Sequence, residues 1–141
     1  MNIRGFIGHT VMTEYGPWIG EKEIYSAKEL VRNSTSYSEI IHPVIAPHAT
    51  DTVDPKTLIE LKEFADSNDV PIHIHLSQTQ REFDYIKEKY GLSPIKHAEK
   101  IGLLDKNLIA AHCNYVEKGD LEILANANIY PVFCPTTHGV G

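Results

Sequence analysis

Short β-branched runs alternate with longer amphipathic runs along this 141-residue sequence, and this alternation limits the possible folds more than any other feature. The candidate strands are residues 3–7, 40–46, 70–75, 107–112 and 129–134. One or two segments of helical periodicity separate each strand from the next. Because strands joined through helices run parallel, the pattern predicts an α/β fold of about five parallel strands with intervening helices.

The ends of the predicted helices carry specific signals. Asp54 and Pro55 are typical of an N-cap followed by proline at the first helical position, and they predict a helix that runs to about residue 68. Ser93 and Pro94 repeat this signal, and Gly102 closes the short helix that follows. Further helices are predicted near residues 23–33, 81–89 and 119–126. No linker-like stretch interrupts these segments, so we expect a single unit over residues 1–141.

Composition and charge exclude several classes of protein. The sequence is 42% hydrophobic and 23% charged, as in globular proteins, and no apolar run reaches the roughly 18 residues of a membrane span. The first ten residues, MNIRGFIGHT, lack the pattern of a secretory signal, so we expect a cytoplasmic location. The net charge is -6 and the basic residues are scattered. We therefore expect neither a nucleic-acid partner nor a membrane partner.

Four histidines lie at the carboxyl ends of successive predicted strands. His48 lies just past the second strand, His75 ends the third, His112 ends the fourth, and His138 follows the fifth. In parallel α/β folds, ligands bind at the carboxyl ends of the strands, so side chains there converge on one cleft. The spacing therefore predicts a metal site or an acid/base site at this edge.

Each histidine also has a plainer interpretation. A lone histidine near a strand end is more often a hydrogen-bonded polar residue than a ligand, and we favour this interpretation for His138. It is favoured more clearly for three others: His9, His42 and His97. His73 and His75 are two residues apart on a strand, so they share a face. They are either two ligands of one metal or, as we favour, one ligand and one hydrogen-bonded neighbour.

The two cysteines do not indicate a metal site of their own. Cys113 follows His112, and Cys134 ends a predicted buried strand, positions that suit a small apolar side chain. The C-x-x-C spacing of a thiolate zinc site is absent from the sequence. We expect both cysteines to be reduced.

Four motifs in order carry a family resemblance: APHAT, IHIHLSQTQREF, YGLSPIKHAEKIGLLDKNLIAAHC and CPTTHG. From about residue 40 onward, the chain resembles the central part of the amidohydrolase superfamily, closest to the methylthioadenosine/S-adenosylhomocysteine deaminase and chlorohydrolase branch. The resemblance implies a (β/α)8 TIM barrel with one divalent metal, usually zinc, which activates water to displace an amino group or a halide from a heterocycle. It implies a metal-dependent hydrolase of C–N bonds whose partner is a small amino-heterocycle.

The resemblance also implies roles for single residues. His75 matches the metal-binding histidine at the end of the fifth barrel strand, and His112 matches the catalytic sixth-strand histidine that orients the water or the leaving group. His48 matches a substrate-binding histidine after the fourth strand. Gln78 stands at a substrate-contacting position where these deaminases usually have a glutamate that shuttles a proton. Glutamine cannot titrate, so this departure favours a better leaving group or a different substrate.

Two parts of the family pattern have no counterpart in the sequence: the H-x-H pair of the first strand and the aspartate of the eighth. A complete barrel has eight strands and about 250 residues, whereas about five strands are predicted for this chain. We therefore expect residues 1–141 to be a fragment covering roughly strands three to seven, with the N- and C-terminal parts of the barrel missing. Such a fragment is expected to bind metal weakly or not at all and to be inactive alone.

Two other hypotheses stay open. The first is a non-catalytic, truncated α/β module that folds through homo-oligomerisation, because a partial sheet has open edges that pair with other chains. The second is another metal-dependent barrel hydrolase, similar to dihydroorotase or imidazolonepropionase. Those lineages usually have a carboxylated lysine or a different loop motif where this chain has LSQT.

Overall fold

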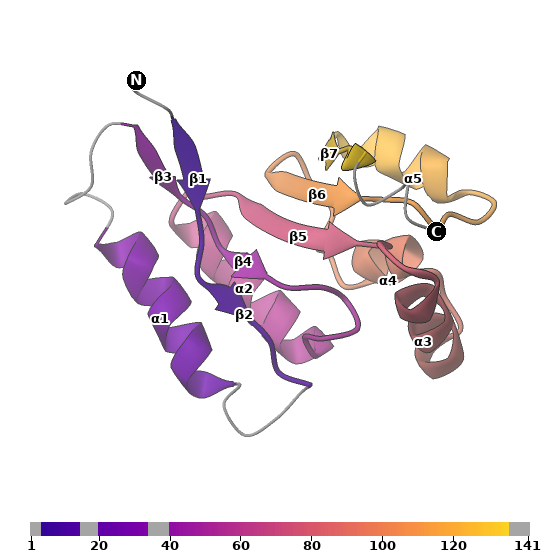
Figure 1. Cartoon of the computed structure of the whole chain (residues 1–141), viewed down its shortest axis with the longest axis horizontal. Helices are drawn as coiled ribbons and strands as arrows, with labels where there is room; N and C mark the ends of the chain where they lie inside the picture. Colours follow the sequence, from indigo (N-terminus) through magenta and orange to yellow (C-terminus); the bar gives the residue numbers. More distant parts are fainter. Residues whose placement is uncertain (1–3, 15–19, 34–39, 136–141) are drawn as a thin grey trace.

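The structure, a computed structural model, describes residues 4–14, 20–33 and 40–135. Strands and helices alternate along the chain (Figure 1). The elements are β1 (Gly5–Ile7), β2 (Thr10–Val11), α1 (Glu21–Arg32), β3 (Ile41–Pro43), β4 (Ala46–Pro47), α2 (Pro55–Ser67), β5 (Ile72–Leu76), α3 (Gln80–Tyr90), α4 (Pro94–Lys100), β6 (Leu108–His112), α5 (Asp120–Ala127) and β7 (Tyr130–Val132). Within these residues, no helix combines the length and apolar character that a membrane span requires. The cytoplasmic location stays a prediction.

Every paired strand in the described residues runs parallel to its neighbour. β1 pairs with β3, β2 pairs with β4, and β5, β6 and β7 form a three-stranded sheet in that order. Single parallel bridges from Ile45 to Ile72 and from Ala49 to His75 join the first strands to β5. The strand positions therefore follow one another in chain order, which confirms the predicted parallel α/β fold.

The predicted strand over residues 40–46 is divided into β3 and β4. Pro43, at the end of β3, has no N–H group to donate to a neighbouring strand. The Val44 N–H donates to the Ile7 carbonyl oxygen at 3.0 Å, whereas the Ile45 N–H donates to the Pro71 carbonyl oxygen at 3.0 Å. Successive residues therefore bond to the strands on either side, as in any inner strand of a sheet, so the chain between β3 and β4 still joins β1 to the segment before β5.

The neighbouring strand position is also divided, into β1 and the unpredicted β2, and Gly8 lies between them. A Cβ atom on Gly8 would lie 2.6 Å from the Cβ of Ala46 and 2.9 Å from the carbonyl oxygen of Val44. Because real Cβ contacts are essentially never this short, only glycine allows the two strands to approach so closely.

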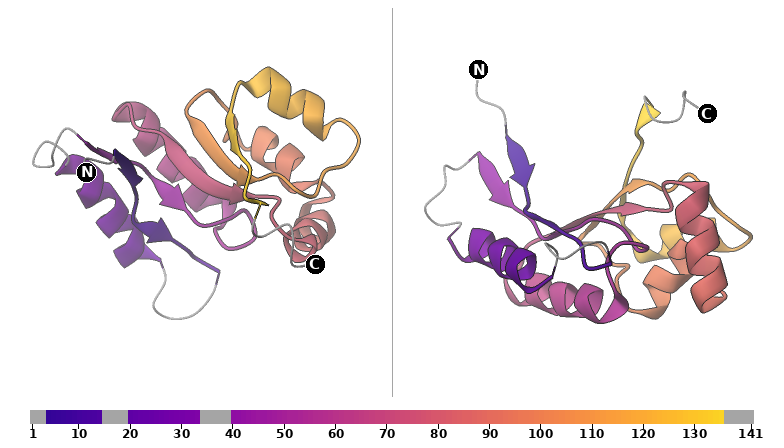
Figure 2. Two further views of the ribbon diagram at one scale, coloured as in Figure 1. Left: turned by 45° about the horizontal axis from the view of Figure 1, so that its top comes forward. Right: turned by 60° about the horizontal axis from the view of Figure 1, so that its bottom comes forward.

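The helices gather on one side of the curved sheet, and the opposite face is concave (Figure 2). β5 shows how the two faces differ. Ile72, Ile74 and Leu76 are buried in the main core, whereas His73 and His75 alternate with them and are half-buried. α2 contributes buried residues to the same core, including Leu58, Leu61 and Ala65. The two histidines therefore share the face away from this core, as their spacing predicts.

The helix ends carry the predicted caps. The Asp54 carboxylate accepts a hydrogen bond from the Thr57 N–H at 3.0 Å, and the Ser93 hydroxyl accepts one from the Lys96 N–H at 3.1 Å. Gly102 follows α4 with φ of 74°, a left-handed conformation that costs glycine little. These signals confirm the helices over α2 and α4 and fix where the loops before them end.

Candidate functional site

Three imidazole rings meet where successive strands end. His48 follows β4, His75 lies in β5, and His112 is the last residue of β6. The ring centroids of His48 and His75 are 5.2 Å apart, and those of His75 and His112 are 5.1 Å apart. The Nε2 atom of His112 lies 3.1 Å from the Nδ1 atom of His75, within hydrogen-bond distance. These three side chains, which we call the histidine row, come together as the strand-end positions predict.

The backbone around the histidine row adopts left-handed conformations. The φ angles are 82° at His112, 51° at Cys113 and 52° at Ser77, in a region that residues with a Cβ atom rarely occupy. The loops hold one another in place, because the Cys113 N–H donates to the Leu76 carbonyl oxygen at 2.8 Å and the Asn114 N–H donates to that of Ser77 at 3.0 Å. Such conformations cost about 1–3 kcal/mol each and concentrate at functional sites.

A buried carboxylate fixes the loop after β5. Glu82 is only 2% exposed, and its Oε1 accepts hydrogen bonds from the Thr50 hydroxyl at 2.6 Å and the Ser77 N–H at 3.0 Å. Its Oε2 accepts the Gln78 N–H at 2.7 Å. Burial raises the pKa of Glu82, and these hydrogen bonds oppose the rise. The sequence analysis gave Glu82 no role, although Thr79 and Glu82 have the spacing of a capping box, which marks a fixed helix start.

The environment of His75 favours its neutral form. Burial lowers the pKa of His75, and the nearby His48, His112 and His73 lower it further. A neutral imidazole has one nitrogen lone pair available to a metal ion or to a hydrogen-bond donor. In contrast, burial raises the pKa of the Cys113 thiol to about 11, so the thiol is protonated at neutral pH and is a poor ligand in this state.

Two cavities adjoin the histidine row. A cavity of about 250 Å³ on the concave face is lined by His48, His73 and His75, among others. A second cavity of about 470 Å³, which we call the rim cavity, is lined by His48, Thr52 and Gln78, among others. His48 lines both cavities. Gln78 therefore lies in the neighbouring cavity, beside His48, and outside the row itself.

The other histidines lie in different surroundings. His97 is buried in α4 and stacks on Tyr90, with ring centroids 4.2 Å apart and ring planes 14° apart. His9 contacts the carboxylate of Glu23 in α1. Both arrangements are compatible with the structural roles favoured from the sequence. His138 lies outside the described residues.

The described residues do not complete a catalytic metal site. Within residues 4–14, 20–33 and 40–135, no three His, Cys, Asp or Glu side chains lie close enough together to hold a metal ion. Catalytic zinc sites generally use three protein ligands and one water. His75 is one candidate ligand among the described residues, and no two further ligands lie close enough to complete such a site with it.

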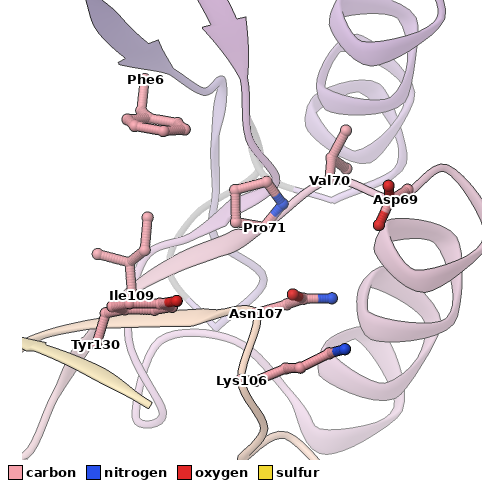
Figure 3. A pocket seen from close by; sticks show the side chains of 8 residues that line it. All are labelled: Phe6, Asp69, Val70, Pro71, Lys106, Asn107, Ile109 and Tyr130. Carbon is pink, nitrogen blue, oxygen red and sulfur yellow. The ribbon is translucent and has the colours of Figure 1, made fainter. Parts of the chain in front are cut away.

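A third cavity, of about 440 Å³, lies at the opposite end of the strands, and we call it the amino-end cavity. Figure 3 shows Phe6, Ile109 and Tyr130 on one side of it and Asn107 and Lys106 on the other. Phe6 and Tyr130 are 60% and 63% exposed, although both are aromatic. No sequence motif marks these residues.

A sequence profile of the amidohydrolase family matches residues 1–140. The chain belongs to the amidohydrolase family. It is 41% identical over 100 residues to a 5-methylthioadenosine/S-adenosylhomocysteine deaminase of Aquifex aeolicus, an alignment that covers 71% of this chain and 23% of the relative. Among solved structures, an adenosine deaminase from Xanthomonas campestris with bound zinc superposes with a TM-score of 0.83 at 24% identity, covering 94% of this chain and 30% of that one.

A guanine deaminase from C. acetobutylicum with bound guanine superposes on this amidohydrolase chain with a TM-score of 0.86 at 20% identity, covering 99% of this chain and 36% of that one. These likenesses confirm the predicted fold class, a partial (β/α)8 barrel of parallel strands with intervening helices. The chain spans about a third or less of the length of the curated relatives it matches.

Proposed function

We propose that this chain carries part of the active site of a metal-dependent hydrolase that acts on C–N bonds of amino-heterocycles. The observation that carries the proposal is the histidine row at the carboxyl ends of β4, β5 and β6, the edge where barrel enzymes bind their ligands. Relatives and structural neighbours with deaminase names, for adenosine derivatives and for guanine, support the substrate class.

We propose His75 as a metal ligand. Its neutral state leaves one nitrogen lone pair for a cation, and the zinc found in structural neighbours supports a divalent metal in this family. The remaining ligands are proposed to lie on barrel strands other than those described, with this chain supplying roughly strands three to seven. When bound, such an ion supplies a water molecule of lowered pKa.

We propose His112 as the catalytic imidazole. Its Nε2 lies 3.1 Å from Nδ1 of His75, so a water or leaving group held beside His75 is close to the His112 ring.

We propose His48 and Gln78 as substrate-binding residues, because both line the rim cavity beside the row. The backbone of Gln78 is fixed by Glu82 and by Asn114, whose side-chain amide donates to the Gln78 carbonyl oxygen at 3.2 Å. Its side-chain amide can both donate and accept hydrogen bonds but cannot move a proton. Gln78→Glu is therefore expected to increase ammonia release by at least about 10-fold, because it installs a titratable group.

The test is hydrolysis of adenosine, 5-methylthioadenosine and guanine by the longest polypeptide that the gene encodes, with and without added zinc. The proposal predicts zinc-dependent ammonia release that falls by about 100-fold or more in His75→Ala and in His112→Ala. His42→Ala is the matched control, since His42 lies in β3, outside the row, with its ring tilted against that of Phe6 and the ring centroids 5.3 Å apart. Full activity in His75→Ala, or zinc binding without turnover of any of these compounds, contradicts the proposal.

A second candidate is a non-catalytic module that assembles with further copies of itself through its open sheet edges. The exposed aromatic rings at the amino-end cavity favour it, because Phe6 and Tyr130 lie on the outermost strands β1 and β7. This candidate predicts an oligomer by light scattering with no turnover at any zinc concentration. A stable monomer rules it out.

A further inference from the structure

The side chain of Thr52 contacts His48 from the loop between β4 and α2. The Oγ1 atom of Thr52 lies 2.9 Å from the Nδ1 atom of His48, and Thr52 is only 6% exposed. The two residues are four apart, in a turn where the N–H groups of Thr52 and Val53 donate to the Ala49 carbonyl oxygen at 3.3 Å and 3.1 Å. The hydroxyl group is therefore held against one nitrogen of the imidazole by the local backbone.

The direction of this hydrogen bond follows from the groups around it. A threonine hydroxyl has one proton, and it has two acceptors in reach: His48 Nδ1 at 2.9 Å and the Ala49 carbonyl oxygen at 3.3 Å. The carbonyl oxygen has two lone pairs, and both already receive backbone N–H groups. The imidazole nitrogen is the closer acceptor, and no other group among the described residues bonds to it. The hydroxyl proton is therefore best placed on the bond to Nδ1.

This direction fixes the tautomer of His48. A neutral imidazole carries its proton on one nitrogen only, so an Nδ1 atom that accepts a hydrogen bond leaves the proton on Nε2. Among the described residues, none bonds to Nε2 of His48, and the ring lines both the concave-face cavity and the rim cavity. With the Thr52 proton on the bond to Nδ1, His48 offers an N–H donor on the side of the ring away from Thr52.

We propose that Thr52 is a positioning residue that holds His48 as the Nε2–H tautomer, so that the site selects heterocycles presenting an unprotonated ring nitrogen. This inference rests on the proposed function and narrows the class of substrates proposed there. A substrate ring nitrogen without a proton accepts a hydrogen bond from His48 Nε2–H. A substrate ring N–H at the same place would put two donors against each other, so neither N–H would have an acceptor. The hydroxyl of Thr52 is assigned to act on the substrate through His48, to which it is bonded.

The tautomer is measured directly by long-range ¹H–¹⁵N correlation of the histidine rings at about pH 8, where an ordinary imidazole is neutral. Signals of His48 are assigned by their loss in His48→Gln. In the unsubstituted chain, His48 Nε2 is expected to have the ¹⁵N chemical shift of a protonated ring nitrogen. Nδ1 is expected to have the ¹⁵N chemical shift of an unprotonated nitrogen that accepts a hydrogen bond. The reverse pattern overturns the proposal, and this result needs no catalytic activity.

Three variants separate positioning from simple packing. Thr52→Val keeps the shape but removes the hydroxyl, so the Nδ1 shift is expected to lose its hydrogen-bonded character, whereas Thr52→Ser is expected to restore it. Thr57→Val is the matched control, because it removes another buried hydroxyl that bonds to Asp54. An unchanged His48 pattern in Thr52→Val, or an equal change in Thr57→Val, contradicts the proposal.

Turnover then tests the selection. In the active polypeptide, Thr52→Val is expected to raise KM about 10-fold for a heterocycle with a bare ring nitrogen while kcat changes less. The analogue carrying N–H at that position is expected to be a poor substrate for the unsubstituted enzyme. If zinc-dependent turnover occurs while His48 carries its proton on Nδ1, the proposed function stands and this inference fails. If the Nε2–H pattern is found without turnover, the tautomer stands and the proposed function fails.

Discussion

The two ends of the same parallel strands differ in almost every physical property. At the carboxyl ends, polar and titratable groups are fixed by hydrogen bonds, as in the contacts of His112 with His75 and of Thr52 with His48. At the amino ends, Phe6, Ile109 and Tyr130 line one side of a cavity whose other side carries Asn107 and Lys106. At the carboxyl ends, buried polar contacts hold a few side chains in fixed positions. At the amino ends, apolar side chains stay exposed.

This difference shows how a parallel fold places the candidate catalytic groups at one end of the strands and the exposed apolar side chains at the other. The loops after the strands carry the left-handed residues Ser77, His112 and Cys113, and their strain is held by bonds between neighbouring loops. The strands themselves are held by the core under the helices. Substitutions at the two ends are therefore expected to differ in their effects on the free energy of unfolding, and four of them test the comparison.

The largest effect is expected from Glu82→Ala. The change leaves the Thr50 hydroxyl and the N–H groups of Ser77 and Gln78 without their acceptor, and each buried unsatisfied donor costs about 1–3 kcal/mol. We expect a loss of at least about 3 kcal/mol in the free energy of unfolding, measured by urea denaturation. Glu88→Ala, at an exposed position of the same helix, is the control. Equal losses in the two variants would show that Glu82 does not hold the loop.

A smaller loss is expected from Gly8→Ala. The new Cβ atom would lie 2.6 Å from the Cβ of Ala46, so the strands beside the histidine row must move apart. Overpacking of this kind costs about 1–3 kcal/mol. Gly5→Ala is the control, because the nearest atom to its Cβ is 3.8 Å away. Thermal denaturation of both variants measures the difference, and a Gly8→Ala protein as stable as Gly5→Ala contradicts the close strand approach.

The cap of α2 is expected to contribute less and to depend on pH. Asp54→Ala removes the acceptor of the Thr57 N–H, a change that costs about 1 kcal/mol. Burial alone would raise the pKa of Asp54, but hydrogen bonds from Thr57 outweigh it and lower the pKa below its ordinary value of 3.8. The stabilisation is therefore complete above pH 3.8 and is lost as the pH falls through the lower, folded-state pKa.

Urea denaturation of Asp54→Ala over a series of pH values checks this expectation. The difference from the unsubstituted chain is expected to shrink as the pH falls below 3.8. Glu63→Ala, at an exposed position of the same helix, is the control and is expected to change little. A difference that grows towards acidic pH contradicts the sign of the linkage.

The smallest effect is expected at the amino-end cavity. Phe6 is 60% exposed, so Phe6→Ala is expected to change the free energy of unfolding by less than about 0.5 kcal/mol. Leu76→Ala, which removes a fully buried side chain, is expected to cost about 2–5 kcal/mol in the same assay. A comparable loss in Phe6→Ala would mean that the cavity is filled in solution, and the contrast between the two ends would fail.

The sequence predicted the parts of the fold that local signals specify. The Asp54 and Ser93 caps marked helix starts, and the strand ends placed His48, His75 and His112 at one edge, as the structure has them. The roles of these residues and of Gln78 came from the family resemblance and stay proposals. What the sequence did not predict depends on contacts between distant segments. The close approach of the strands at Gly8 and Ala46 is one such contact.

The contact of Glu82 with Thr50 joins residues 32 apart, and no periodicity or motif spacing specifies it. The Thr52 contact with His48 is local, but its meaning depends on the carbonyl oxygen of Ala49, whose lone pairs only the folded turn occupies. Hydrogen-bond direction is a property of all the groups around a donor. It therefore becomes visible only once the loops are in place.

The central claim is that His48, His75 and His112 form one row. Nuclear Overhauser effects between the histidine ring protons test it most directly, because the ring centroids are 5.2 Å and 5.1 Å apart. We predict cross-peaks from the His75 ring to the rings of both His48 and His112, and none to the ring of His42. Cross-peaks from His75 to His42 with none to His112 would contradict the account.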